Sequence, residues 1–548
     1  MPMTTFHLTT SHFDDHFPDT VSYRIKDASE NRLVCYDLCN ALSHNEWDIG
    51  KYDEILDVYL FESIINLGKF HRNYFKSGQD IPTRGLRKHV TDIMTESPTE
   101  WVKAPKFPQD FWPRLKAYAE KCRKHACAVG TCNHYRDIEI PFSLALYNLS
   151  RNGIKIDLKR IETIHSNIEN AQQKLERALE INNLGGTEIR DLNAWIKAYD
   201  FDEYFPAGRN EISIKDLSLL EDQHQVFKIF LRVNKLKRIR NILKNFGDQA
   251  VIKPFYKTMG AVTGRCTSIK PNIMGIPKIF RPIVVPSQKN FGIVECDYSQ
   301  MEVGVAAALS GDRNLIHDFN TGDVYERTGE HLFGNRSPKS RNKAKIIFLG
   351  IQYGMSKNTL AKRLGIGRSA TSEILNNIYA KYSHLKNFLN NQEKLGEKDG
   401  FVSSISGLRR YRRCPNSKAS YWEKNWFKNF PVQSSAATVF KGAITRMERK
   451  FKGQAFNLLV PLYDSVVFEA PLNQLPEITT GVKACMIESM TDYFPVLKPK
   501  VTVNDADPSC WNSEGKSNSI EAFLNDPLSG INIREKSSNN ADWSDYFG

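Results

Sequence analysis

The chain has 548 residues, of which 41% are hydrophobic and 11% aromatic. This composition can build large cores, it excludes a disordered protein, and at roughly 150 residues per domain the length suggests three or four units. An excess of 75 Lys and Arg over 62 Asp and Glu gives a net charge of +13, which favours a polyanionic partner, and no apolar run is long enough to cross a bilayer.

The first 135 residues mix short apolar runs with acidic and aromatic stretches. The opening MPMTTFHLTTSHFDDHF carries two Asp and no Lys or Arg, so we expect no signal or transit peptide and a cytoplasmic protein. Residues 122–134 (CRKHACAVGTCNH) hold Cys122, Cys127, Cys132 and two histidines. A zinc site is one interpretation, but the usual CxxC pairs are missing, so we expect reduced cysteines on a helix face.

Helical and strand patterns alternate through the rest of the chain. Residues 141–157 predict a helix, a stop at Gly153 and a short strand. Residues 158–182 have the apolar spacing of a long amphipathic helix, and 213–246 form a second helical zone with a basic end. Residues 339–398 are again helical, and 429–510 mix helix and strand. The polar tail from 513 is either a frayed end or a peptide that docks a partner.

Two aspartates stand out within strand-like runs. Asp297 ends an apolar run containing Ile293 and Val294, just before a helix-like stretch, and Asp464 separates LLVPL from VVF in the pattern of a hairpin tip. Either Asp alone could be an ordinary turn residue. Brought together, the pair could hold two Mg²⁺ ions about 3.5–4 Å apart for phosphoryl transfer.

Two further segments carry cations in suggestive positions. On a helix, Arg341, Lys345, Leu349 and Tyr353 lie at successive i,i+4 steps and share one face, which could meet phosphates, a base and a sugar. Arg265, in the TGR turn, could bind a backbone phosphate with both arms of its guanidinium. Each segment alone is equally compatible with a solvated surface.

Together these motifs resemble the family A DNA polymerases, over residues 136–512 and in the family's order. The stretches that carry the resemblance are TGR with PNIMGIP (263–277), DYSQME (297–302), DVYERTG (323–329), RNKAKIIFLGIQYGMS (341–356), NFPVQSSAATVF (429–440) and LYDSV (462–466). The resemblance implies an α/β multidomain chain with a right-hand polymerase fold of palm, fingers and thumb.

The resemblance also implies roles for individual residues. Asp297, Asp464 and the carbonyl of Tyr298 would hold two Mg²⁺ ions, with Mn²⁺ as a substitute, and Lys345 would be the general acid for pyrophosphate. The incoming dNTP would be bound by Glu302 as the steric gate against a 2′-hydroxyl and by Gln300, Tyr325, Arg341, Lys345, Leu349 and Tyr353. The primer-template DNA would be contacted by Arg265, Asn272, Arg281, Asn429, Gln433 and Tyr463.

The sequence departs from the family pattern at several of these positions. The usual His-Asp-Glu of the second palm motif is Tyr463-Asp464-Ser465, so the metal site has one carboxylate fewer nearby. Leu349 replaces the aromatic residue that stacks on the incoming nucleotide, and Tyr325 replaces a triphosphate-binding histidine. We expect the reaction to survive, with weaker stacking and low sensitivity to dideoxynucleotides.

The expected domains follow the motifs. Residues 1–135 are either a shortened RNase H-like 3′–5′ exonuclease domain that has lost its catalytic carboxylates, with Asp48 as a remnant, or an unrelated accessory module. Residues 136–262 form the thumb and the start of the palm, 263–318 the first palm segment, 319–428 the fingers, 429–512 the second palm segment and 513–548 the tail.

The resulting hypothesis is a monomeric, template-directed DNA polymerase without proofreading, of a phage or mobile element and therefore in the host cytoplasm. The tail could bind a processivity or replisome partner. One alternative is a non-catalytic primer-template binding protein, which Tyr463, Ser465 and Leu349 favour. Another is an RNA polymerase or reverse transcriptase, and Glu302 argues against the use of ribonucleotides.

Overall fold

The computed structural model describes residues 9–10, 21–22, 24–27, 32–35, 38, 54–65, 67, 111–205, 208–218, 220–221, 223–244, 246–412, 414–504 and 508–511. The chain divides into two compact units, each taken by itself below. The first comprises residues 1–152, 255–269 and 294–503, and the second residues 153–254, 270–293 and 504–548. Among the described helices, none combines the length and the apolar character needed to cross a membrane.

The first unit is built on a four-stranded sheet in the order β13-β14-β10-β15. β10 (Phe291–Tyr298), which belongs to this unit from Val294 onward, is buried over most of its length, and β15 (Val501–Asn504) lies at one edge. β13 (Asn457–Leu462) and β14 (Ser465–Pro471) form an antiparallel hairpin in which Leu462 pairs with Ser465. Their largely apolar sequences are buried along almost their whole length, and the turn between them is Tyr463-Asp464, as predicted.

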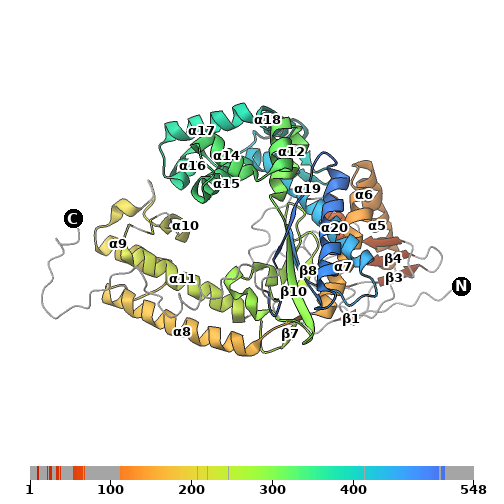
Figure 1. The fold of residues 1–548 in the computed structure, drawn as a ribbon, viewed down its shortest axis with the longest axis horizontal. Helices are drawn as coiled ribbons and strands as arrows, with labels where there is room; N and C mark the ends of the chain where they lie inside the picture. Colours follow the sequence, from red (N-terminus) through yellow and green to blue (C-terminus); the bar gives the residue numbers. More distant parts are fainter. Residues whose placement is uncertain are drawn as a thin grey trace. The chain divides into compact units, whose positions relative to one another are not determined.

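A group of helices follows β10 (Figure 1). The helices are α12 (Met301–Ser310), α13 (Arg313–Thr321), α14 (Val324–Phe333), α15 (Pro338–Gln352), α16 (Lys357–Leu364), α17 (Arg368–Lys381) and α18 (Ser383–Asp399). The helical prediction for 339–398 is therefore confirmed. Several start at side-chain caps: Asp312, Asp323 and Ser337 each accept a backbone N–H three residues on.

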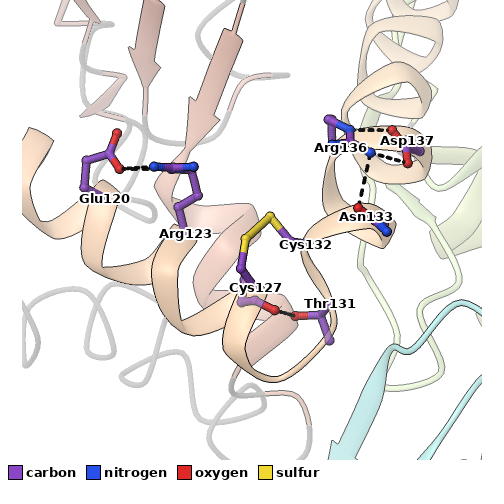
Figure 2. The surroundings of a disulfide bond; sticks show 9 residues. Glu120, Arg123, Cys127, Thr131, Cys132, Asn133, Arg136 and Asp137 are labelled. Carbon is purple, nitrogen blue, oxygen red and sulfur yellow. Dashed lines mark hydrogen bonds and ion pairs between the residues drawn. A yellow bond between two sulfur atoms is a disulfide. The ribbon is translucent and has the colours of Figure 1, made fainter.

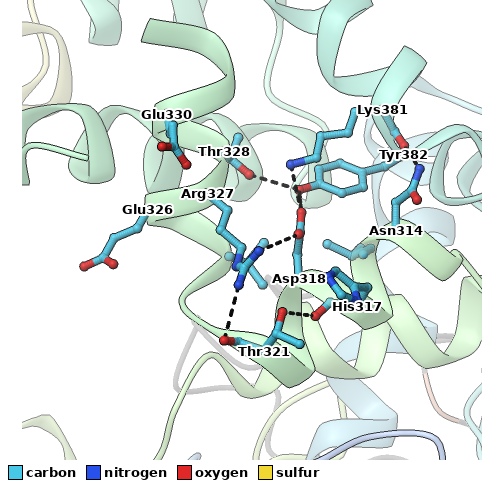
Figure 3. Close-up of polar contacts among 12 residues, drawn as sticks. Asn314, His317, Asp318, Thr321, Glu326, Arg327, Thr328, Glu330, Lys381 and Tyr382 are labelled. Carbon is cyan, nitrogen blue, oxygen red and sulfur yellow. Dashed lines mark hydrogen bonds and ion pairs between the residues drawn. The ribbon is translucent and has the colours of Figure 1, made fainter. Parts of the chain in front are cut away.

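A buried polar cluster ties three of these helices together (Figure 3). The Tyr382 hydroxyl donates to Asp318 at 2.7 Å, and Lys381 forms an ion pair with the same carboxylate at 2.8 Å. Arg327 approaches Asp318 at 3.6 Å, and the hydroxyls of Thr328 and Tyr382 lie 3.2 Å apart. Because Asp318 is only 6% exposed, this network fixes how α14 lies against α13 and α17.

The longest helix of the first unit, α19 (Tyr421–Lys450), crosses the unit's core. Ser420 caps it with Glu423 in a reciprocal capping box, and most residues from Phe427 to Met447 are buried. α20 (Leu475–Tyr493) packs beside α19. The hairpin of β11 (Phe401–Ser403) and β12 (Arg409–Tyr411) is joined to α19 because Ile405 donates its N–H to Ser435.

The described part of the N-terminal region shares the core of the first unit. Its strands are β1 (Thr9–Thr10), β2 (Val21–Ser22), β3 (Arg24–Asp27), β4 (Arg32–Cys35) and β5 (Glu54–Asp57), and its helices are α2 (Val58–Ile65), α5 (Phe111–Ala128), α6 (Cys132–His134), the π-helical η3 (Tyr135–Glu139) and α7 (Ile140–Asn152). Leu60 and Phe61 of α2 belong to the same apolar cluster as Phe427 and Phe430 of α19.

The cysteine prediction was wrong for one pair. Cys127 at the end of α5 and Cys132 in α6 form a disulfide (Figure 2). The turn between them, held by the Thr131 hydroxyl on the Ala126 carbonyl, returns the chain so that residues five apart in sequence meet. Cys122 is a buried free thiol. His134 is buried as well and hydrogen-bonds to Glu139 at 2.9 Å, so this histidine belongs to a salt-bridge network of the core.

The second unit contains the predicted long helices. α8 (Leu158–Ile181) and α11 (Gln225–Lys244) pack along each other, and the short α9 (Ile189–Ala198), η4 (Asp202–Tyr204) and α10 (Ile214–Leu217) lie between them in sequence. β6 (Ile154–Lys155) pairs with β7 (Val251–Ile252), and η5 (Ile273–Gly275) and η6 (Lys278–Ile283) complete the unit. The predicted stop at Gly153 is confirmed, with φ +74°.

Candidate active site

The two predicted aspartates lie at the ends of neighbouring strands in the first unit. Asp297 is the penultimate residue of β10, and Asp464 sits in the two-residue turn that leads into β14. The backbone N–H of Tyr298 donates to the carbonyl of Asp464 at 3.0 Å, which joins the two chain segments directly. Tyr298 itself is buried, and its hydroxyl donates to the carbonyl of Met486, so the strand end is anchored.

Glu302, in the first turn of α12, is surrounded by donors from three other elements. Its carboxylate pairs with Arg265, accepts from Gln352 at 2.9 Å and from the Tyr353 hydroxyl at 3.2 Å, and lies 3.4 Å from Gln433. Gln433 also donates to the Tyr353 hydroxyl at 2.6 Å. The side chain of Glu302 is 17% exposed, so this carboxylate is the centre of a fixed polar network that joins α12, α15 and α19.

Arg265 is presented to that network by a tight turn. β8 (Phe255–Lys257) and β9 (Thr267–Ile269) pair as a hairpin, and the loop between them closes where Gly264 donates its N–H to the Ala261 carbonyl at 2.9 Å. Gly264 has φ +77°, and a Cβ there would meet Leu408 at 3.1 Å, so the turn favours glycine. The guanidinium of Arg265 also lies over the Tyr463 ring, 5.4 Å from its centroid.

A second cation, Arg341 on α15, is held at the start of α14. It donates to Asp323 at 2.7 Å and lies 5.7 Å from the centre of the Tyr325 ring. Tyr325 is buried, and its burial raises the pKa of its phenol, so the hydroxyl stays protonated. Lys345 is exposed and Leu349 half-buried further along the same helix. Tyr353 directly follows the helix at its C-terminal end.

Gln300 positions the start of α12. It takes the left-handed conformation, with φ +57°, and its side-chain oxygen accepts the N–H of Val324 at 3.0 Å. The contact fixes the end of β10 to the beginning of α14.

The predicted DNA contacts divide between the two units. Gln433 and the half-buried Asn429 lie on α19, and Tyr463 lies in the hairpin turn with φ +57° and 37% exposure. Asn272 and Arg281 belong to the second unit. There Asn272 caps η5 and Arg281 stacks on Trp511, 4.5 Å from the ring centre. Gln433, Asn429 and Tyr463 therefore lie in the same unit as the two aspartates. Asn272 and Arg281 lie in the second unit.

The charges around Asp464 act in opposite directions. Desolvation of its carboxylate raises the pKa of Asp464 and Arg265 lowers it, while Glu302 and Glu295 add to the rise, so the pKa lies above its usual value. For Arg265, burial opposes the charged form, but Glu302, Tyr353 and Asp464 together outweigh it, so the pKa of the guanidinium is raised. Two carboxylates, Glu302 and Glu295, thus act on Asp464 against one arginine, which suits a site for a cation.

The donor chemistry fits a hard divalent cation. Mg²⁺ binds oxygen atoms, commonly through one or two carboxylates, and completes its shell with water and substrate phosphates. Asp297 and Asp464 supply two carboxylates from adjacent strands. Across the described residues no three His, Cys, Asp or Glu side chains are grouped to hold an ion by themselves. Water and substrate phosphate oxygens would complete the shell, as is usual for Mg²⁺.

Comparison with known proteins identifies the family. The model of DNA polymerase family A matches residues 202–505, more than half of the chain. The chain belongs to DNA polymerase family A. Among curated relatives, this family A chain is 27% identical over 392 residues to DNA polymerase I of Lactococcus lactis subsp. lactis, covering 66% of the chain and 44% of the relative. It is 26% identical over 397 residues to the thermostable DNA polymerase I of Thermus filiformis, covering 67% and 46%.

A solved structure supports the fold assignment. The POL domain of Pol1 from M. smegmatis, in complex with DNA primer-template and dNTP, superposes with a TM-score of 0.74 at 20% identity, covering 87% of this chain and 86% of that one. The right-hand polymerase fold expected from the motifs is confirmed. This family A chain spans about half the length of the curated relatives it matches.

Sequence reasoning missed several neighbours of the site. Gln352 and Asp323 contact Glu302 and Arg341, respectively. Both lie inside motifs that carry the family resemblance, but neither was assigned a role of its own from the sequence. Glu295 had a usable signal, because residues two apart on a strand share a face and Glu295 stands two before Asp297. A charged residue within an otherwise apolar strand indicates a functional position, and Glu295 is such a residue.

Proposed function

We propose that this chain is a template-directed DNA polymerase that adds deoxynucleotides to a primer 3′-hydroxyl with release of pyrophosphate. The observation that carries the proposal is the pairing of the Asp297 and Asp464 strand ends through the Tyr298 N–H, in the same unit as the Arg265–Glu302 pair. Two carboxylates at the ends of adjacent central strands, with cations on helix α15, suit phosphoryl transfer, in which the protein supplies positioning and electrostatic stabilisation.

The metal-binding role falls to the strand ends. Asp297, Asp464 and the backbone carbonyl of Tyr298 would hold two divalent ions, Mg²⁺ or Mn²⁺. When bound, these ions would neutralise charge on the attacking and leaving oxygens. Neighbouring strands fix the spacing of the two carboxylates, which limits the reorganisation needed at the moment of reaction.

The nucleotide-binding role falls to α12, α14 and α15. Arg341 would exchange Asp323 for a phosphate oxygen, and exposed Lys345 would bind the triphosphate and donate a proton to pyrophosphate. Glu302 would lie under the sugar and leave no room for a 2′-hydroxyl. Tyr353 would lie at the insertion site, where Gln433 and Glu302 fix its hydroxyl. Further along these elements, Gln300, Tyr325 and Leu349 would line the nucleotide site.

The duplex would be bound mainly by α19 and the TGR turn. In the part of the chain that the structure describes, the buried Arg265 Nε, Asn429 Oδ1 and Ser434 Oγ lack a hydrogen-bond partner. A buried polar atom without a partner is costly, so these atoms support a ligand with donors and acceptors, as the edges of base pairs have. Gln433, Tyr463 and, from the second unit, Asn272 and Arg281 would add contacts. Binding should weaken steeply with salt.

The domain assignment is part of the proposal. Residues 1–135 would be an exonuclease-like domain without activity, 136–262 the thumb and the start of the palm, 263–318 and 429–512 the palm, 319–428 the fingers and 513–548 the tail. The buried carboxylate of Asp57, which caps α2 by accepting from Leu60 and also accepts from Leu38, supports a structural use of an acidic group in this region. Asp48 lies outside the described residues.

We further propose a monomeric replicase of a phage or mobile element, in the host cytoplasm, with a processivity or replisome partner bound through the tail.

A primer-extension assay tests the activity. A 5′-labelled primer annealed to a longer template is incubated with Mg²⁺ and four dNTPs, with and without the Asp297→Asn and Asp464→Asn changes. We expect wild-type extension and none with either variant, while duplex affinity measured by fluorescence anisotropy stays close to wild type. Asp492→Asn, which removes an exposed carboxylate of α20, is the matched control and should extend normally.

The same labelled primer tests the finer proposals. Shortening of the primer without nucleotides would contradict the inactive exonuclease domain, and equal extension with ribonucleotides would contradict the role of Glu302. A wild-type chain that binds the duplex tightly and never extends it would favour the non-catalytic binding protein, for which Ser465 beside Asp464 is the specific observation. Normal extension by either aspartate variant would overturn the assignment of the site.

A further inference from the structure

A third carboxylate stands next to the two aspartates of the candidate site. Glu295 lies on β10 two residues before Asp297. Because side chains alternate along a strand, Glu295 and Asp297 project from the same face of the sheet. The residues between and before them, Cys296 and Val294, are fully buried on the other face, whereas Glu295 and Asp297 are both half-buried. One face of β10 therefore carries two neighbouring carboxylates, Glu295 and Asp297.

The neighbouring strand completes the arrangement. Ser465, which directly follows Asp464, donates its hydroxyl to Glu295 Oε1 at 2.9 Å. The backbone carbonyl of Asp464 accepts from the Tyr298 N–H at 3.0 Å. Two cross-strand hydrogen bonds therefore tie the Asp464–Ser465 segment to β10, one through the backbone and one through the Ser465–Glu295 pair. A shift of this segment along β10 would strain both of them.

The hydrogen-bonded pair of Ser465 and Glu295 bears on the carboxylate that the second palm motif lacks. Ser465 occupies the position where the family resemblance led us to expect a carboxylate, and Glu295 brings a carboxylate within hydrogen-bond distance of that position. A strand pair can keep the same charge at one place in space with the carboxylate on either strand. The carboxylate that seemed to be missing in sequence is present in the fold.

We propose that Glu295 is a positioning residue for the polymerase reaction: through Ser465 it fixes the Asp464 turn, and its charge raises the affinity of the two aspartates for divalent cations. This inference rests on the proposed function. Since no three acidic groups of the described chain are spaced to hold one ion, Glu295 acts beside the ligands. Groups that orient or polarise metal ligands in this way typically change metal affinity or activity by about 10–100-fold when lost.

Three variants separate charge, hydrogen bond and position. Glu295→Gln keeps the shape and an acceptor for Ser465 but removes the charge. Ser465→Ala keeps the charge and removes the hydrogen bond. The exchange variant, Glu295→Ser with Ser465→Glu, returns a carboxylate to the same place from the other strand. Glu488→Gln, which removes an exposed carboxylate of α20, is the control for a general loss of charge.

The first readout is the affinity of the polymerase–primer-template complex for Mn²⁺ without nucleotide, monitored by electron paramagnetic resonance. The second is the Mg²⁺ concentration that gives half the maximal single-turnover rate of primer extension. We expect Glu295→Gln to weaken Mn²⁺ binding by about 10–100-fold and to raise the half-maximal Mg²⁺ concentration similarly. Ser465→Ala should have a smaller effect, the exchange variant should recover most of the loss, and Glu488→Gln should match wild type.

Two results would overturn the proposal. One is wild-type Mn²⁺ affinity in Glu295→Gln. The other is an exchange variant no better than Glu295→Gln, because the two positions would then not share one role. If Glu295→Gln does not fold, Glu295→Ser replaces it in both comparisons. A wild-type chain that binds Mn²⁺ and DNA but never extends a primer would refute the proposed function, while the Mn²⁺ series would still decide the role of Glu295.

Discussion

The buried salt bridge between Glu139 and Lys441 offers a sharp test of what holds α19 in place. Lys441 Nζ lies 2.5 Å from Glu139 Oε1, the two side chains are 2% and 0% exposed, and His134 Nε2 donates to the same oxygen at 2.9 Å. The partners are 302 residues apart and join the π-helical turn η3 to α19. The ring of Phe142 covers the ammonium at 5.3 Å. Both charges are therefore removed from water.

The expected cost follows from that burial. Removing one member of a buried pair leaves the other charge desolvated and costs about 3–5 kcal/mol, whereas replacing both with uncharged groups is often neutral. Lys441→Met leaves the fully buried Glu139 with His134 alone and should fall at the upper end. Glu139→Gln retains an acceptor for Lys441 and should fall at the lower end. The double variant should be more stable than either single one.

The assay is hydrogen exchange of α19 peptides, whose protection gives the free energy of local opening without assuming that both units unfold together. Single variants within about 1 kcal/mol of wild type, or a double variant as unstable as the sum of the two, would refute the buried-charge argument.

The same pair predicts an acid dependence. Burial alone would raise the pKa of Glu139, but Lys441 and His134 more than compensate, so the pKa in the folded protein is lowered. A carboxyl with a depressed folded pKa contributes its stability above the unfolded value of about 4.3, and that contribution is lost as the pH falls through the folded pKa. Wild type should therefore lose near-ultraviolet dichroism on acidification below about pH 4.3 more steeply than Glu139→Gln.

Three further predictions concern other parts of the chain. Glu302→Ala should lower discrimination against ribonucleotides roughly tenfold or more, measured as the ratio of kcat/KM for dNTP and rNTP; an unchanged ratio would contradict the gate. Leu349→Phe should lower the KM for dNTPs by about tenfold, because a ring on this half-buried position can stack on a base; a raised KM would contradict that placement. Cys132→Ser should lower the free energy of unfolding by about 2 kcal/mol through the lost crosslink to Cys127, and a reductant should destabilise wild type but leave the variant unchanged.

The parts of the fold that could be predicted from the sequence are those set by local periodicity. The spacing of apolar residues gave α8 almost to the residue, and two β-branched runs around Asp464 gave the β13–β14 hairpin. The strand ending at Asp297 followed from one apolar run and the polar cluster after it. In each case the signal lies within about twenty neighbouring residues, which is the range over which helix and strand periods act.

Contacts between distant segments could not be predicted in this way. Arg265 and Glu302 were each assigned a partner on the substrate, and their pairing with each other depends on how the β8–β9 turn meets α12. Glu139 and Lys441 were assigned no role from the sequence, because their contact depends on how η3 packs against α19. The disulfide between Cys127 and Cys132 was not predicted for a different reason: it depends on the tight turn at Thr131, which brings the end of α5 back to the start of α6.

The two cations proposed to bind phosphates share one feature that bears on specificity. Arg265 is paired with Glu302 and Arg341 with Asp323. A phosphate that binds either arginine therefore replaces a carboxylate partner, and the gain is the difference between two charge-assisted contacts. For Glu302 the loss is softened, because Gln352 and Tyr353 still donate to it after Arg265 leaves. Binding of DNA through Arg265 would then leave Glu302 oriented by α15, the helix that also carries Arg341 and Lys345. The same exchange of partners that engages the duplex would thus preserve the position of the carboxylate proposed to exclude the 2′-hydroxyl.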